Sequence, residues 1–258
     1  MLSLDEIRSF FPESLHRFPR FMLREYLQYK ILESLYATKH AQTLCFLGGT
    51  CLRIVHGNQR FSEDLDFDNL GLRENEFAGV TDTIRKQLTR EGYGVELKQV
   101  KRGAWHCYIR FPGLLFAEEL SPHQEEKILI QLDTEPQHFA YDPQRVILNK
   151  FEVFTTILTT PVSLLFAQKL VAILKRSRTR GRDLYDVVFL MGKGVEADYA
   201  YVYSKTGIAD KQALKHAILD TCQSLDMDKL AREVEPFLFH AKDREKVRQF
   251  PAYFSQSF

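Results

Sequence analysis

The sequence predicts an α+β fold in which a small mixed sheet is followed by a helical half. Short apolar or alternating segments, which are typical of strands, gather between residues 41 and 135, and a strongly helical pattern begins at residue 163. The first residues also show helical spacing. We therefore expect a helical segment over residues 1–40, a core over residues 41–150, and a mainly helical half over residues 151–258.

Composition places the chain among ordinary globular proteins. Of its 258 residues, 45% are hydrophobic and 27% are charged, and the net charge of +1 gives no general attraction to nucleic acid. The four cysteines are scattered and form no CxxC pair, which favours reduced thiols. No apolar run approaches 18 residues and no leader is evident, so we expect a cytoplasmic protein without a membrane span.

The N-terminal segment is predicted to consist of helices that pack on the core. Ser3 and Glu6 have the spacing of a capping box at a helix start. Between Phe21 and Ala37, apolar residues recur at four-residue spacing, which predicts one buried helical face. These residues are Leu23, Leu27, Ile31 and Leu35.

The most informative stretch is residues 44–68, with the sequence LCFLGGTCLRIVHGNQRFSEDLDFD. Residues 44–47 predict a short buried strand that ends in Gly48-Gly49-Thr50, and a helix is expected to follow. Glycine lets the backbone approach a ligand closely, and the amides at a helix N-terminus attract anions. Gly48, Gly49 and Thr50 are therefore candidates for binding phosphates.

A pair of acids follows on the next predicted strand. Because side chains alternate across a strand, Asp64 and Asp66 leave the same face. Two carboxylates about 4 Å apart repel by about 4 kcal/mol at an effective dielectric constant of about 20. Hydrogen bonds, a shared proton or a divalent cation can hold them together. Mg2+ binds a few carboxylates together with substrate phosphates, so Asp64 and Asp66 are candidate Mg2+ ligands.

Each part of this motif is weak alone, since glycine pairs are common and two alternating acids usually mark a solvated strand face. The combination of strand, Gly-Gly-Thr, helix and paired acids is much more specific. Arg53, His56, Arg60 and Ser62 can also face a substrate. His56 is more typical of a helix surface, and Ser62 either hydrogen-bonds a phosphate or ties down the start of the strand.

Residues 73–135 predict a helix and three strands. The helix covers residues 73–91, and the segments 93–100 and 105–111 form a hairpin in which Trp105 either anchors the sheet or stacks on a base. A third strand over residues 127–134 has Asp133 near its end, where an aspartate can simply initiate a turn.

We expect residues 136–160 to be a link. Pro136, Pro143 and Pro161 lie in or next to this stretch, and it is predicted to carry the chain from the sheet to the helical half, with a boundary near residue 150.

The helix predicted over residues 163–176, SLLFAQKLVAILKR, is apolar nearly all round. A helix of this kind is mostly buried, so Lys169 at its centre needs an explanation. Lys169 either contacts the phosphates of a nucleotide or extends along the surface to solvent. Arg176, seven residues later, lies on the same stripe of the helix.

Five basic residues and two acids follow this lysine. Lys175, Arg176, Arg178, Arg180 and Arg182 form either a solvated charge run or a site for RNA or triphosphate phosphates.

In the next predicted helix, Asp183 and Asp186 share a face. Asp183 can cap the helix, whereas Asp186, one turn inside, is harder to explain structurally. Residues 193–258 are predicted to be helical with loops.

The residues of these motifs resemble those of a known family. GGTCLR followed by RFSEDLDF, and later RDLYD, is similar to the AbiEii-type toxin branch of the DNA polymerase β nucleotidyltransferase superfamily, over roughly residues 40–190. The resemblance implies a polymerase-β-like core and a third carboxylate, for which Asp133 is the candidate, that helps to deprotonate the attacking hydroxyl. It also implies that Lys169 and an aspartate after it belong to the active site, with Asp186 preferred and Asp183 as the rival.

The resulting expectation is a Mg2+-dependent nucleotidyltransferase that moves a nucleotide from a nucleoside triphosphate to an acceptor hydroxyl and releases pyrophosphate. The resemblance further implies a toxin with a separately encoded antitoxin, and it favours a transfer-RNA 3′ end as acceptor. Transfer to a protein or a small molecule, and a non-catalytic nucleotide- or RNA-binding regulator, are the alternatives. The sequence does not name the base that is transferred.

Overall fold

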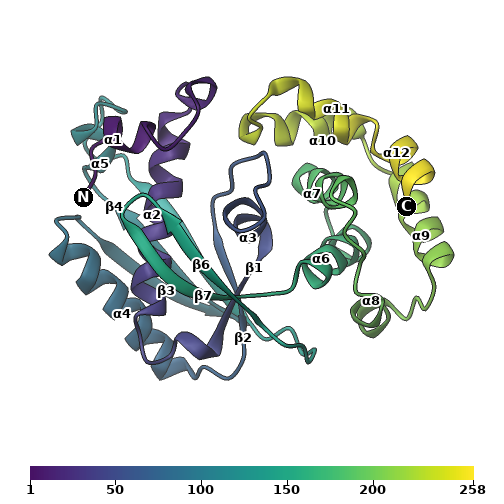
Figure 1. Cartoon of the computed structure of the whole chain (residues 1–258), viewed down its shortest axis with the longest axis horizontal. Coiled ribbons are helices and arrows are strands. Elements are labelled where there is room, and N and C mark those ends of the chain that lie inside the picture. Colours follow the sequence, from purple (N-terminus) through teal and green to yellow (C-terminus); the bar gives the residue numbers. More distant parts are fainter. The chain divides into compact units, whose positions relative to one another are not determined.

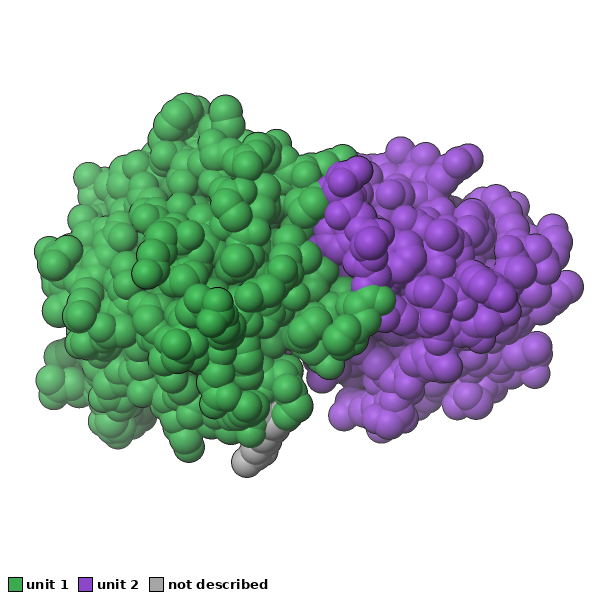
Figure 2. Space-filling view, turned by 90° about the horizontal axis from the view of Figure 1, so that it is seen from below, with its two compact units in different colours: residues 1–55, 61–138, 143–159 green, residues 56–60, 139–142, 160–258 purple. Residues whose placement is uncertain are grey.

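The computed structural model describes residues 1–258, apart from the side chain of Arg102. The chain forms two compact units, shown as a cartoon in Figure 1 and coloured separately in Figure 2. Unit 1 comprises residues 1–55, 61–138 and 143–159. Unit 2 comprises residues 56–60, 139–142 and 160–258.

Unit 1 is built on one mixed sheet with the strand order β3-β4-β5-β2-β1-β7-β6. Strand β2 lies at its centre, antiparallel to β1 and parallel to β5. The strands are β1 (Leu44–Leu47), β2 (Leu65–Asn69), β3 (Glu96–Arg102), β4 (Ala104–Phe111), β5 (Ile128–Glu135), β6 (Gln144–Lys150) and β7 (Val153–Thr159). The α+β prediction is confirmed, including the hairpin of β3 and β4.

One face of this sheet is covered by two long helices, α2 (Pro19–Tyr36) and α4 (Glu74–Arg90) (Figure 1). The predicted apolar stripe of α2 is fully buried, and Leu65 and Phe67 of β2 are buried as well. Shorter helices complete the unit: α1 (Leu4–Arg8), α3 (Gly48–Ile54), α5 (Leu114–Ala117) and two 3-10 turns, Glu13–Leu15 and Ala41–Thr43. Ser3 and Glu6 form the predicted capping box at α1.

The opposite face of the sheet carries polar side chains where β4, β5 and β2 lie side by side. Asp66 of β2 is in register with Asp133 of β5, and Asp133 is in register with His106 of β4. Residues that pair across neighbouring strands project from the same face of a sheet. The three side chains therefore form one row across the sheet.

The prediction that residues 136–160 are a link is wrong. This stretch contains strands β6 and β7, which form an antiparallel hairpin at the edge of the sheet. Pro143 directly precedes β6 and Pro161 lies beyond the end of β7, so the prolines bound the hairpin and do not interrupt it. The boundary predicted near residue 150 falls between the two strands, and the change of unit comes after Thr159.

Unit 2 is helical. Its helices are α6 (Val162–Lys175), α7 (Gly181–Gly192), α8 (Tyr199–Thr206), α9 (Lys211–Gln223), α10 (Met227–Val234), α11 (Glu245–Arg248) and α12 (Phe250–Ser257), with 3-10 turns at Glu235–Phe237 and Ala241–Arg244. Asp198, Asp210 and Asp226 cap α8, α9 and α10 by accepting hydrogen bonds from backbone amides. Phe250 and Phe254 are buried.

The close packing of α7 on α10 depends on Gly181, because a Cβ there would lie 2.1 Å from the carbonyl oxygen of Leu230. The segment 56–60 belongs to unit 2, where Arg60 forms a β-bridge with Leu238.

In the part of the chain that the structure describes, no helix has both the length and the apolar composition needed to cross a membrane.

Candidate active site

The Gly-Gly-Thr segment forms the first turn of α3, directly after β1, as the sequence predicted. Gly48 has a φ of +81°, a conformation that side-chain-bearing residues rarely adopt. A Cβ at this position would lie 2.3 Å from Oδ2 of Asp66. The Asp66 carboxylate therefore lies directly against the backbone at the start of α3, and only glycine leaves room for it.

The start of the acid strand is held by hydrogen bonds to its backbone. The Thr50 hydroxyl donates to the carbonyl oxygen of Asp64. Nε2 of Gln28, on α2, donates to the carbonyl oxygens of Ser62 (3.0 Å) and Glu63 (2.9 Å). These bonds fix the chain that leads into Asp64. The side chain of Thr50 thus positions the acid strand, and only its backbone amide remains as a candidate donor to a phosphate.

Asp64 and Asp66 are both partly exposed and lie one residue before and one residue inside the start of β2. Among the described residues, no three His, Cys, Asp or Glu side chains group closely enough to form a complete protein metal site. Mg2+ does not require such a cage, because it commonly binds one or two carboxylates together with water and substrate phosphates. The pair of Asp64 and Asp66 fits that kind of ligand set.

Asp133 has close protein partners. Its Oδ1 lies 2.7 Å from Nδ1 of His106, and Nε2 of Gln131 lies 2.9 Å from Oδ1 and 2.8 Å from Oδ2. The turn-initiating role is not what the structure shows, since β5 continues beyond Asp133 to Glu135. His106 was not predicted as a site residue. Its partner is 27 residues away, so only the strand register reveals the contact.

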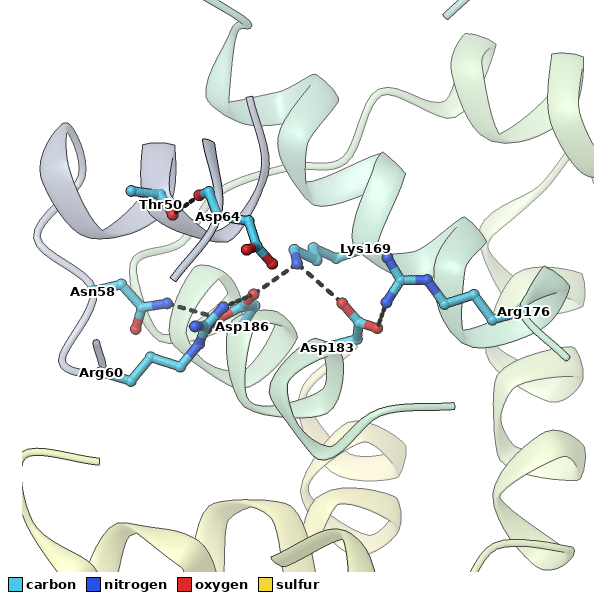
Figure 3. A network of polar contacts seen from close by, with 8 residues as sticks. All are labelled: Thr50, Asn58, Arg60, Asp64, Lys169, Arg176, Asp183 and Asp186. Carbon is cyan, nitrogen blue, oxygen red and sulfur yellow. Dashed lines mark hydrogen bonds and ion pairs between the residues drawn. The ribbon is translucent and has the colours of Figure 1, made fainter. Parts of the chain in front are cut away.

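In unit 2, Lys169 of α6 forms ion pairs with both aspartates of α7 (Figure 3). Its Nζ lies 3.0 Å from Oδ1 of Asp183 and 2.8 Å from Oδ2 of Asp186. Arg176 contacts the other carboxylate oxygen of Asp183. The structure therefore brings together all four residues that the sequence predicted in this half. Asp183 does not cap α7; it pairs with the two cations.

Asp186 is completely buried, and its strongest partner is Arg60. The sequence indicated Arg60 as a residue that can face a substrate. Arg60, which is 1% exposed, contacts Asp186 with two nitrogens, Nε to Oδ1 and Nη2 to Oδ2, both at 2.7 Å. Asn58 Nδ2 donates to Oδ1 at 2.8 Å. Paired contacts of this kind are among the strongest charge-assisted hydrogen bonds. Arg60 is therefore an anchor inside unit 2, where it neutralises the buried acid.

The electrostatics of this cluster keep its members charged. Burial alone would raise the pKa of Asp186, but the charges of Arg60 and Lys169 and their hydrogen bonds outweigh it and lower the pKa to about 2. Burial likewise tends to lower the pKa of Lys169, yet Asp186 and Asp183 raise it above its ordinary value. With Arg176, the cluster contains three cations and two anions, so its net charge is +1.

The basic run lies at the end of α6 and in the loop that leads into α7. Lys175, Arg176, Arg178 and Arg180 are exposed, and Arg182 is half-buried with its guanidinium 5.7 Å from the centre of the Phe237 ring. Arg178 forms an ion pair of 2.8 Å with Glu233. Most of the run therefore presents cations to solvent on unit 2.

Two solved structures share this fold. JHP933 from Helicobacter pylori is 17% identical and aligns over 92% of each chain with a TM-score of 0.55. A provisionally assigned nucleotidyltransferase from H. pylori is 16% identical and aligns over 92% of this chain and 95% of its own, with a TM-score of 0.56. At these identities the likeness shows the fold alone, and it agrees with the predicted fold class. No curated protein matches the chain significantly.

The family assignment comes from a separate comparison. The profile of the family "Nucleotidyl transferase AbiEii toxin, Type IV TA system" matches residues 30–253, which is most of the chain and includes both the acid strand of unit 1 and the lysine–aspartate cluster of unit 2. The predicted resemblance is confirmed. The chain belongs to the AbiEii family of nucleotidyltransferase toxins of type IV toxin–antitoxin systems.

Proposed function

We propose that this toxin is a Mg2+-dependent enzyme that transfers a nucleotide from a nucleoside triphosphate to the 3′ end of a transfer RNA. The observation that carries the proposal is the placement of the Asp66 carboxylate against Gly48 at the start of α3, two residues after Asp64. Carboxylates for a cation and backbone amides for phosphates thereby lie together where β1 ends and β2 begins, at the middle of the sheet of unit 1.

The reaction is in-line attack of an acceptor hydroxyl on the α-phosphorus, with pyrophosphate as leaving group. Asp64 and Asp66 hold the cation, and the amides of Gly48, Gly49 and Thr50 bind phosphate oxygens. Bound Mg2+ supplies charge neutralisation for the attacking and leaving oxygens. Because phosphoryl chemistry of this kind depends on positioning and electrostatics, the fixed backbone around Asp64 is the main contribution of the fold.

Lys169 of α6 is the proposed cation for the triphosphate. Its support is its position between the carboxylates of Asp183 and Asp186, which keep the buried ammonium charged. Asp186 and Asp183 orient the ammonium, and Arg176 is the second candidate for an anionic ligand. The proposed role of Ser62 is to bind a phosphate through its hydroxyl, and the bond from Gln28 to its carbonyl oxygen fixes the backbone at this position.

The acceptor is proposed to be RNA because of the exposed cations between α6 and α7. Lys175, Arg178 and Arg180 project from one loop region of a chain whose overall charge is only +1. Such a local patch is what phosphate binding requires. As a toxin of a type IV system, the protein is expected to be controlled by a separately encoded antitoxin.

The test is incubation of the purified chain with each ribonucleoside triphosphate, labelled at the α-phosphate, together with Mg2+ and total RNA. The expected result is label at the 3′ end of RNA of transfer-RNA size, with release of pyrophosphate and loss of both in EDTA. Label in added protein or in small molecules would identify another acceptor. Absence of label from every fraction for all four triphosphates would contradict the proposed function.

A further inference from the structure

Both carboxylate oxygens of Asp133 accept hydrogen bonds from neighbouring side chains, which distinguishes Asp133 from a carboxylate whose oxygens are available to a metal ion. Oδ1 accepts hydrogen bonds from both His106 and Gln131, and Oδ2 accepts one from Gln131. The described residues contain no group of three metal-ligating side chains, although Asp66 is the register neighbour of Asp133. The titratable side chain that contacts Asp133 is the imidazole of His106.

The geometry of this pair matches a histidine that donates from Nδ1 to a carboxylate. Nδ1 of His106 lies 2.7 Å from Oδ1 of Asp133, and because an ionised carboxylate can only accept hydrogen bonds, we assign the ring proton to Nδ1. In the neutral ring, Nε2 is then the nitrogen that can accept a proton. An aspartate that holds one imidazole nitrogen, with the other nitrogen as base, is the arrangement by which many enzymes activate a hydroxyl.

The pair lies in the row of polar side chains on the sheet face opposite α2 and α4. His106 is in register with Asp133, and Asp133 is in register with Asp66, so the histidine is two strands from a proposed metal ligand. The side chains of His106 and Asp133 are 21% and 26% exposed. Both are therefore accessible from the face that carries the acids. On the other side, His106 pairs with Val100 of β3, which brings no charge.

We propose that His106 is the general base of the reaction and that Asp133 acts through it as a positioning residue. This inference rests on the proposed nucleotidyl transfer and changes the role expected for the third carboxylate. Nε2 of His106 takes the proton as the O–H bond of the acceptor hydroxyl breaks. The hydroxyl oxygen forms a bond to the α-phosphorus. The bond between the α-phosphorus and the oxygen that bridges to the β-phosphorus breaks, and its electron pair leaves with pyrophosphate.

The imidazolium that results is stabilised by the carboxylate of Asp133, and its proton passes to solvent before the next turnover. Gln131 contributes by holding both oxygens of Asp133, which fixes the direction of the carboxylate toward the ring. Proton transfer to a positioned base contributes about 10²- to 10⁴-fold to reaction rates. Loss of Nε2 alone is therefore expected to slow transfer by a factor in this range.

The experiment uses His106→Asn, because the asparagine amide can still donate to Asp133 from the position of Nδ1 but has no atom in place of Nε2. Single-turnover transfer of labelled nucleotide to RNA is measured with saturating triphosphate. We expect a rate about 10²- to 10⁴-fold below the parent, with unchanged triphosphate affinity and an unchanged melting temperature. His106→Gly is expected to be slow as well, and added imidazole should restore part of its rate.

The matched control is His123→Asn. His123 also faces an acid of unit 1, Glu125, but the contact is 4.0 Å long and both side chains are largely exposed. This variant should transfer at the parental rate. Asp133→Asn should be slow in the same way as His106→Asn, and imidazole should not rescue it, since the ring is still present.

Two results would overturn the role of His106. A parental rate in His106→Asn would show that the histidine only holds Asp133, which would return the role of base to the carboxylate. A slow His106→Gly variant that imidazole fails to accelerate would show that the ring is structural. Both results leave transfer by the parent chain intact. Failure of the proposed function is a separate outcome, in which the parent itself transfers no label.

Discussion

At the scale of single residues, the buried charges of unit 2 are the most demanding feature of the chain. Asp186 has no exposed surface, yet it stays ionised because Arg60, Lys169 and Asn58 surround it. Removing one partner of a buried ion pair leaves an uncompensated charge, which costs far more than the pair contributes. The stability of unit 2 therefore depends on residues that are distant in sequence.

We predict that Arg60→Ala lowers the free energy of unfolding by about 3–5 kcal/mol. Lys169→Ala should cost less, because Arg60 still contacts both oxygens of Asp186, but it should slow nucleotidyl transfer by orders of magnitude. Urea denaturation measures the first effect. Arg178→Ala is the control: this side chain is 72% exposed in its ion pair, so the loss should stay within about 1 kcal/mol. Equal urea midpoints for Arg60→Ala and Arg178→Ala would contradict the anchoring role.

Acid should weaken the same cluster. The pKa of Asp186 is lowered from 3.8 to about 2 in the folded chain, so the ionised carboxyl stabilises the fold above the unfolded value. That contribution is lost as the pH falls through the folded value. The stability advantage of the parent over Asp186→Asn should thus shrink by about 2 kcal/mol between pH 4 and pH 2. A difference that is constant across this range would show that Asp186 does not titrate as described.

At the scale of elements, the turn from β1 into α3 is the most constrained part of unit 1. We predict that Gly48→Ala destabilises the chain by at least about 1–3 kcal/mol and abolishes transfer, because of its φ of +81° and the approach of Asp66. Gly79→Ala in α4 is the control. Nothing lies within 4 Å of a Cβ there, and helix propensity should stabilise it by about 0.5–1 kcal/mol. Thermal melting of both variants compares them, and a Gly48→Ala variant as stable as Gly79→Ala would refute the argument.

The elements also show what could be predicted from the sequence. The path from β1 through α3 to Asp64 was predicted because its signals are local, within 25 residues. The hairpin of β6 and β7 was missed because β6 is an edge strand with mostly exposed, polar side chains, and because Pro143 and Pro161 suggest a loop. The partners Arg60 and Asp186 are 126 residues apart, and nothing in either local sequence indicates the other.

At the scale of the whole molecule, the chain passes back and forth between its two units. It leaves unit 1 after Val55 and returns at Phe61, and the segment between them supplies Asn58 and Arg60 to Asp186. A fragment that begins at residue 160 would therefore leave this buried acid without two of its partners. The helical half depends on residues that the sequence places beside the acid strand.

The net charge of the whole molecule is only +1, so RNA binding depends on local cations. We predict that Arg178→Glu with Arg180→Glu weakens RNA binding and flattens its dependence on salt, by about 0.7–0.9 log–log units per lost phosphate contact. The control reverses Arg85 and Lys86, which are exposed on α4 of unit 1. If both double variants keep the parental salt slope, the run between α6 and α7 is only a solvated surface.

The central claim is that Asp64 and Asp66 support a metal-dependent transfer reaction, and the most direct measurement is a Mg2+ titration of labelled-nucleotide transfer. We predict that Asp64→Asn and Asp66→Asn lose transfer by orders of magnitude at every Mg2+ concentration while retaining the parental melting temperature. Asp82→Asn, in which an exposed acid of α4 is neutralised, should follow the parental titration. Full transfer by either Asp64→Asn or Asp66→Asn with Mg2+ present would contradict the account.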